Sequence, residues 1–244
     1  MDRPMITLVI PMYNESSIIE ETAATLDKYM RENFEHYEIL FSDDGSLDGC
    51  GDLVRKAELP SVRVTGYEKN RGKGAAVRHA VMEAEGDIIM FTDADLAYGT
   101  DVIKRAYDSL SGDDETKFLI GSRNLSKDGY EGYTAIRKLM SKVYIKVLCI
   151  VGGFKLSDSQ CGCKAFKREA ARDIFSRCKV DRFAFDFECI LWAQKLGYKI
   201  IEMPVKIINH RESTVNVFKD TFKMLGDLRK IRKRIKKESK NETR

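Results

Sequence analysis

Two aspartates one residue apart, Asp93 and Asp95, follow the apolar run IIMF at residues 88–91. Such a run is typical of a buried strand, and a carboxylate is costly to bury unless it is paired or bound to a metal. We therefore expect both side chains to lie where the strand leaves the sheet. There they hold either a cation, for which carboxylate oxygens are suitable ligands, or a turn.

Polar clusters also end the other apolar strands. These are Tyr13-Asn14-Glu15, Asp43-Asp44-Gly45-Ser46 and Gly121-Ser122-Arg123. Each cluster alone is compatible with a turn or a helix cap. In open parallel sheets, ligands bind outside the carboxyl ends of the strands, so the recurrence of these clusters predicts one shared site.

The segments between the clusters alternate between strand and helix patterns. This repeated order predicts an α/β fold with a mostly parallel central sheet and helices on both faces. The expected strands lie near 6–11, 37–44, 62–68, 87–95 and 117–123, with helices near 15–33, 47–58, 72–85 and 100–111.

After residue 125 the pattern changes. A helix with an apolar face is expected at 136–153, a short strand at 161–166, and helices at 168–178 and 185–197. The final strand pattern, 198–209, is interrupted at Pro204, which indicates a bent or edge strand. We expect one domain over residues 1–216, followed by an extension at 217–244.

The segment NRGKGAA, residues 70–76, is a glycine-rich entry to a helix. Glycines allow the backbone to come close to a ligand, and a helix N-terminus favours anions. Lys73 adds a positive charge, so this segment is a candidate anion-binding element. It lacks the spacing of an ATPase-type phosphate loop.

The composition, 43% hydrophobic and 33% charged, is typical of a soluble globular protein. No signal peptide is evident, and no stretch reaches the ~20 apolar residues of a membrane span. The six cysteines include no Cys-x-x-Cys pair, so we expect reduced structural thiols in a cytoplasmic setting.

Positive charge is concentrated at the end of the chain. Residues 217–244 contain eleven Lys and Arg against four Asp and Glu, whereas the whole chain has a net charge of +4. Phe218, Phe222, Leu225, Leu228 and Ile231 recur there at helical spacing. A basic amphipathic helix predicts binding to a membrane surface, on the cytosolic face here. Nucleic-acid binding is not expected, because the body has no basic-aromatic pattern.

Taken in order, the motifs resemble glycosyltransferase family 2, in particular the polyprenyl-phosphate sugar synthases of the dolichyl-phosphate glucosyltransferase and mannose synthase type. The resemblance runs from about Ile6 to Arg232. It implies the GT-A fold of nucleotide-sugar transferases and an inverting reaction in which a lipid phosphate attacks the anomeric carbon. The motifs are VIPMYNE, FSDDGSLD, NRGKGAAVRHA, FTDADL, GSR, DSQCGCKAF and FDFECILWAQKLGYKIIEMPV.

The resemblance implies a Mg²⁺ or Mn²⁺ site at Asp95, with Asp93 contacting metal, sugar or ribose. Mannose synthases often have glutamine at the position of Ala97, so this chain departs from them there. The nucleotide is either UDP or GDP, because a carboxylate can accept hydrogen bonds from uracil or guanine. The implied donor-binding residues are Pro11, Tyr13, Glu15, Asp43, Asp44, Lys73, Asp93, Ala94, Asp95, Gln160 and Arg211.

By the same resemblance, Arg123, Arg137 and Ser141 bind the acceptor phosphate. Arginine suits this role because its guanidinium meets phosphate with two hydrogen bonds. A phosphate monoester is already an anion at neutral pH, so positioning and charge neutralisation carry the reaction. Asp186 is a further catalytic candidate, expected to contact the sugar or to fix the acceptor site.

The expected reaction is the transfer of a hexose, foremost glucose from UDP-glucose, to a polyprenyl phosphate. The alternatives are a mannose synthase that uses GDP-mannose and a family 2 enzyme with a saccharide acceptor. A non-catalytic sugar- or lipid-binding scaffold belongs to another class, and the intact Asp-Ala-Asp motif disfavours it.

Overall fold

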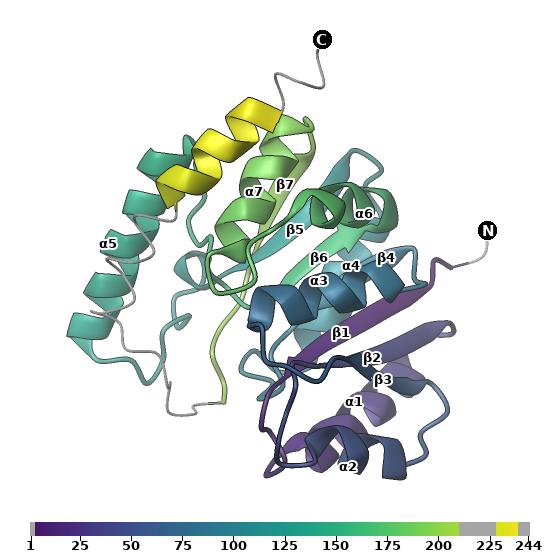
Figure 1. Ribbon diagram of the computed structural model, residues 1–244. Helices are drawn as coiled ribbons and strands as arrows, with labels where there is room; N and C mark the ends of the chain where they lie inside the picture. Colours follow the sequence, from purple (N-terminus) through teal and green to yellow (C-terminus); the bar gives the residue numbers. More distant parts are fainter. Residues whose placement is uncertain (1–2, 210–227, 239–244) are drawn as a thin grey trace.

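The computed structural model describes residues 3–209 and 228–238 and contains one seven-stranded sheet (Figure 1). The strand order is β3-β2-β1-β4-β6-β5-β7. The strands are β1 (Ile6–Met12), β2 (Tyr37–Asp43), β3 (Val62–Gly66), β4 (Ile88–Phe91), β5 (Thr116–Ser122), β6 (Lys164–Lys167) and β7 (Lys199–Pro204).

Strands β1 to β4 pair in parallel, and β5 pairs in parallel with β7. Strand β6 is antiparallel to both of its neighbours, β4 and β5. All other strands therefore run in one direction, and the expectation of a mostly parallel sheet is confirmed. Strand β7 lies at the edge of the sheet and ends at Pro204, where the sequence placed the interruption.

Helices cover both faces of the sheet, as expected (Figure 1). One face packs on α1, α2 and α4, and the other packs on α3, α6 and α7 with part of α5. The helices are α1 (Ile19–Asn33), α2 (Cys50–Lys56), α3 (Lys73–Glu83), α4 (Asp101–Ser111), α5 (Ala135–Gly152), α6 (Arg168–Arg177) and α7 (Phe185–Lys195), with a short 3-10 helix η1 (Arg123–Leu125).

Side chains of the central strands point alternately to the two faces of the sheet and so form two apolar cores. In β4, Ile88 and Met90 pack in one core, whereas Ile89 and Phe91 pack in the other. Side chains on a strand point alternately to its two faces, so a continuous apolar run is needed when both faces are covered. The same requirement ends β4 at Phe91, because the carboxylates that follow cannot enter either core.

The C-terminal helix at 228–238 packs against the protein body, next to α5 and α7 in Figure 1. Leu228, Ile231 and Ile235 are buried there, at 0%, 3% and 6% exposure. The sequence placed Leu228 and Ile231 on a membrane-facing stripe, but these side chains contact protein instead. The outward side is basic, with exposed Arg229, Lys230, Arg232, Lys233, Lys236 and Lys237.

This packing gives a stability prediction. Replacing Ile231 with alanine removes buried methyl groups and should lower the free energy of unfolding by about 2–5 kcal/mol, measured by urea denaturation. The matched substitution Lys233→Ala, on the exposed side of the same helix, should change it by less than about 0.5 kcal/mol. Equal small effects would show that the helix does not pack on the body in solution.

Candidate active site

The polar clusters of the sequence meet at the carboxyl edge of the sheet. Strands β2, β1 and β4 lie side by side and end at Asp43, Met12 and Phe91. Because β6 runs in the opposite direction, its first residue, Lys164, belongs to the same edge. The end of β5, at Ser122, lies beyond β6.

The Asp93–Asp95 segment is a tight turn held from several sides. The amide of Leu96, which has a left-handed φ of 48°, donates to the carbonyl of Asp93 at 3.1 Å. The carboxylate of Asp95 accepts from the amide of Ala97 at 3.0 Å. The Thr22 hydroxyl donates to the Ala94 carbonyl at 2.9 Å, which ties the turn to α1. The turn therefore fixes the backbone on which both carboxylates stand.

Gly162 lies directly against the Asp93 carboxylate. A Cβ atom at this glycine would stand 2.1 Å from Asp93 Oδ2, well inside contact distance. The neighbouring amide is fixed too, since Gly162 N donates to the Tyr98 hydroxyl at 3.3 Å. Gly162 lies in the motif DSQCGCKAF, but the sequence alone does not mark it as a site residue.

Lys73, the first residue of α3, forms an ion pair with Asp93. Burial lowers the pKa of the Lys73 ammonium, but the carboxylates of Asp93, Asp186 and Asp95 outweigh burial and raise it overall. Gly72 precedes it with φ 114°, a conformation that favours glycine. The glycine-rich segment thus brings a charged amine to the aspartate turn.

Negative charge exceeds positive charge at this edge. Burial raises the pKa of Asp95, and the charges of Asp93 and Glu15 raise it further against the opposing effects of the Ala97 amide and Lys73. Within the residues described, no group of three His, Cys, Asp or Glu side chains is arranged to hold a metal. Mg²⁺ and Mn²⁺ are usually held by one or two carboxylates, with phosphate oxygens and water at the other coordination positions. Asp93 and Asp95 can supply the two carboxylates.

Asp186 lies behind this turn in the first turn of α7 and is 8% exposed. It pairs with the fully buried Lys164 at 2.7 Å, and Lys164 also donates to the Cys161 carbonyl at 2.6 Å. Burial raises the pKa of Asp186, while Lys164 and Lys73 oppose that rise. Asp186 therefore joins α7 to the start of β6.

The expected nucleotide wall lies at the ends of β1 and β2. Pro11 is buried in β1, Tyr13 is 43% exposed and Glu15 is half-buried. Asp43 accepts from the Ser46 amide at 2.9 Å, and Asn14 accepts from the Leu47 amide at 2.9 Å. The first bond closes the turn after β2, and the second links the loops that follow β1 and β2.

Asp44, in this wall, stabilises a neighbouring loop through hydrogen bonds. It is 3% exposed, and its carboxylate accepts from the Tyr67 hydroxyl, the Asn70 amide group and the backbone amides of Arg71 and Gly72 at 2.7–3.1 Å. The family resemblance implies a donor-binding role for Asp44. In this structure its carboxylate holds the loop that leads to Lys73.

The three residues expected at the acceptor phosphate surround a pair of tyrosines. Arg123 forms a two-pronged ion pair with buried Asp158, at 2.6 and 3.0 Å, and lies over the Tyr130 ring. The Tyr130 hydroxyl is 3.3 Å from the Ser141 hydroxyl. The exposed Arg137 stacks on Tyr133, 4.1 Å from the ring centroid, and the two tyrosine rings meet edge to face.

Two further donor-side residues remain. Gln160 is half-buried, and its backbone amide donates to Asp158 at 3.2 Å. Arg211 lies outside the described residues. The chain leading to it passes the aspartate turn, because the Asn209 side chain donates to the carbonyls of Asp95 and Leu96 at 3.3 and 3.1 Å.

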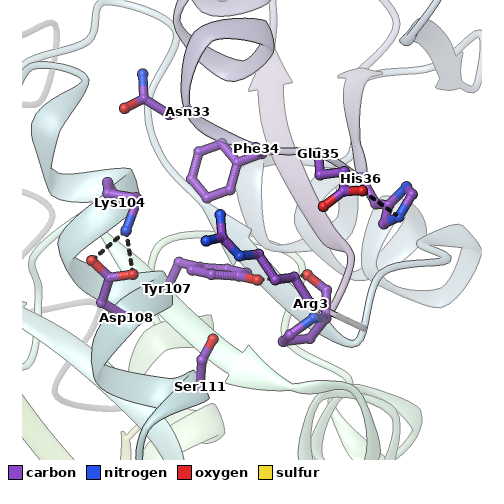
Figure 2. A pocket seen from close by; sticks show the side chains of 10 residues that line it. Arg3, Asn33, Phe34, Glu35, His36, Lys104, Tyr107, Asp108 and Ser111 are labelled. Atoms are coloured by element: carbon purple, nitrogen blue, oxygen red, sulfur yellow. Dashed lines mark hydrogen bonds and ion pairs between the residues drawn. The ribbon is translucent and has the colours of Figure 1, made fainter. Parts of the chain in front are cut away.

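A cavity of about 270 Å³ lies away from the polar clusters, at the amino ends of the strands (Figure 2). Its lining includes Phe34, Tyr107 and the ion pair between Lys104 and Asp108. These residues come from segments that precede strands β2 and β5, so the cavity faces the amino ends of those strands. It is separate from the polar clusters and is not the candidate active site.

Comparison with known proteins identifies the family. The model of glycosyl transferase family 2 matches residues 7–175. The chain belongs to this family. The resemblance inferred from the sequence and the expected class, a glycosyltransferase, are thereby confirmed.

Relatives within the family are similar over most of the chain. A dolichyl-phosphate beta-glucosyltransferase of Trichomonas vaginalis is 34% identical over 211 residues, which are 82% of this chain and 63% of the relative. The human dolichyl-phosphate beta-glucosyltransferase is 31% identical over 246 residues, which are 94% of this chain and 75% of that protein. The chain thus spans about two thirds to three quarters of the length of these two relatives.

Solved structures share the fold. Glucosyl-3-phosphoglycerate synthase from Mycobacterium tuberculosis, crystallised with Mn²⁺, UDP and phosphoglyceric acid, has a TM-score of 0.69 at 16% identity and covers 92% of this chain and 78% of its own. A structure of the same enzyme with Mg²⁺ and UDP has a TM-score of 0.66 at 18% identity, covering 92% of this chain and 79% of its own. The expected GT-A fold is confirmed.

The contact between Gly162 and Asp93 gives a prediction for activity. Gly162→Ala should displace the Asp93 carboxylate and lower kcat/KM by about 100-fold, the effect typical of a 1 Å misplacement. The matched substitution Gly112→Ala, at the end of α4 where a Cβ comes no closer than 3.2 Å to another atom, should leave kcat/KM unchanged. An active Gly162→Ala enzyme would show that Asp93 needs no fixed position.

Proposed function

We propose that the chain transfers glucose from UDP-glucose to a polyprenyl phosphate such as dolichyl phosphate, with inversion at the anomeric carbon and with Mg²⁺ or Mn²⁺. The observation that carries this proposal is the pairing of an acidic turn, Asp93–Asp95, with an arginine–tyrosine cluster along one sheet edge. The similarity to dolichyl-phosphate beta-glucosyltransferases supports the choice of sugar and acceptor.

On the donor side, Asp95 and Asp93 would hold the cation, which neutralises the charge that develops on the departing diphosphate. Lys73 would donate to a phosphate oxygen, and Asp93 keeps its ammonium in place. Tyr13, Glu15 and Asp43 would form the wall for the nucleotide. Asp44 supports this arrangement from beneath through the loop it holds.

On the acceptor side, Arg137 is exposed and offers its guanidinium to an incoming phosphate. Arg123 and Ser141 would complete the phosphate site next to Tyr130. A phosphate oxygen attacks the anomeric carbon as the bond to UDP breaks, and the UDP leaves with the bonding electrons. Because the nucleophile is already an anion, we assign Asp186 to holding the site rather than to removing a proton.

The surface near the acceptor cluster suits a lipid. Ile136, Leu139, Val143 and Ile150 of α5 are 55–72% exposed, and Lys142 and Lys146 are exposed on the same helix. Within the residues described, no helix is long and apolar enough to cross a bilayer. The exposed apolar and basic side chains of α5, with the basic outer side of the C-terminal helix, support our proposal of peripheral binding to the cytosolic face of a membrane.

A transfer assay tests the proposed reaction. The purified protein is incubated with Mn²⁺ and labelled UDP-glucose or GDP-mannose, with dolichyl phosphate, with 3-phosphoglycerate or without acceptor. We expect label in the organic phase only with UDP-glucose and dolichyl phosphate. If lipid is labelled from GDP-mannose, the donor is GDP-mannose and not UDP-glucose. If only 3-phosphoglycerate is labelled, the proposal of a lipid acceptor is wrong.

Arg137 should act on the acceptor alone. Arg137→Ala should raise the KM for dolichyl phosphate about 10- to 100-fold, the loss expected for one charged hydrogen-bonding group. The KM for UDP-glucose should stay unchanged. In the control Lys28→Ala, at an exposed position on α1, both KM values should stay unchanged. An equal rise in both KM values for Arg137→Ala would contradict a specific phosphate contact.

The α5 surface should carry membrane binding. Replacing both Leu139 and Val143 with aspartate should lower binding to vesicles that contain anionic lipid at least about tenfold, because the exposed apolar side chains no longer enter the interface. Leu47→Asp, at an 88% exposed site away from α5, is the control and should bind normally. Co-sedimentation measures both, and identical binding would rule out α5 as the contact.

A further inference from the structure

Glu188 is a fully buried carboxylate in the first turn of α7. One of its oxygens, Oε2, accepts from the backbone amides of Lys179 and Val180 at 2.9 and 2.8 Å. Its other oxygen forms an ion pair with the guanidinium of Arg234. A buried carboxylate without such a cation would be strongly unfavourable, so the two side chains depend on each other.

Arg234 reaches Glu188 because the apolar side of its helix packs against the protein core. Leu228, Ile231 and Ile235 lie on the buried side of helix 228–238 and pack in the same apolar cluster as α7. Arg234 lies next to Ile235 in this helix, and its side chain is 29% exposed. The position of the Arg234 guanidinium is thus set by the packing of apolar side chains that lie 40 to 47 residues after Glu188 in the chain.

The segment that Glu188 holds, residues 179–181, is packed against the start of α3. The carbonyl of Asp181 accepts from the Ala75 amide at 3.1 Å, and its carboxylate pairs with Arg78 and with Arg71. A Cβ atom at Gly72 would lie 2.6 Å from the Asp181 carbonyl oxygen. This contact leaves no room for the two segments to shift independently.

The first residue of α3 is Lys73, whose ammonium pairs with Asp93. A continuous series of contacts therefore runs from the C-terminal helix to the aspartate turn. It passes from Arg234 to Glu188, then through 179–181 to α3 and Lys73. Each step is a hydrogen bond, an ion pair or a close backbone contact.

We propose that Glu188 and Arg234 are positioning residues that fix the donor-diphosphate side of the site. Through this pair, the C-terminal helix contributes to the geometry of the active site. The pair holds segment 179–181, which holds α3 and so sets the place of Lys73. The role of Lys73 toward the diphosphate rests on the proposed function. The mechanical link from Arg234 to α3 does not.

The experiment removes both charges together, as Glu188→Gln with Arg234→Met, so that neither is left buried and unpaired. Glutamine keeps an oxygen for the amides of Lys179 and Val180. The control is Lys233→Met, at an exposed position of the same C-terminal helix, away from Glu188 and segment 179–181. All three proteins are full-length, and circular dichroism confirms folding.

Hydrogen–deuterium exchange reads the link without any ligand. In the double variant, amides in the first turns of α3 should exchange at least tenfold faster than in wild type, whereas amides of α4 (Asp101–Ser111) should be unchanged. The control should match wild type throughout. Unchanged exchange in α3, or an equal increase in α3 and α4, would overturn the proposal.

Kinetics then separates this inference from the proposed reaction. In the double variant, KM for UDP-glucose should rise about tenfold while KM for dolichyl phosphate stays constant, and equal rises in both would count against positioning of the donor side. If the wild-type protein makes no lipid product, the proposed function fails. The exchange measurement still decides whether the C-terminal helix holds α3.

Discussion

The crowding of carboxylates at one sheet edge is the constraint on which the site depends. The charges of Asp93, Asp95 and Glu15 act on one another there, and Lys73 provides an opposing charge paired with Asp93. Such an arrangement is unfavourable unless the backbone is held firmly and further positive charge is available. The left-handed Leu96, the close packing of Gly162 and the loop held by Asp44 supply the first condition. A divalent cation bound with a sugar diphosphate would supply the second.

The two halves of the site differ in how they are built. The acidic half stands on turns that follow β1, β2 and β4, all anchored by hydrogen bonds from backbone amides to side-chain oxygens. The basic half is built from Arg123 and Arg137 on either side of a tyrosine pair, next to an exposed apolar helix. This division suits the proposed reaction, in which a sugar moves from a polar nucleotide to the phosphate of a lipid and the nucleotide leaves.

Much of the fold follows from local patterns in the sequence. Continuous apolar runs that end in polar clusters predicted the parallel strands and their shared edge, because burial on both faces leaves little choice of residue. The insertion of antiparallel β6 between β4 and β5 was not predictable, since its four residues carry no signal for a neighbour. The roles of Asp44 and Gly162 depend on contacts between distant segments, which spacing does not reveal. Likewise, the apolar stripe of the C-terminal helix fits a bilayer or a protein core equally well.

The central claim, a cation site completed by the diphosphate, is tested most directly by Mn²⁺ binding. Electron paramagnetic resonance would follow free Mn²⁺ during titration of the wild-type protein and of Asp95→Asn, each with and without UDP. The account predicts that UDP strengthens Mn²⁺ binding to the wild-type protein and that Asp95→Asn loses this effect. Equal Mn²⁺ binding by both proteins in the presence of UDP would contradict it.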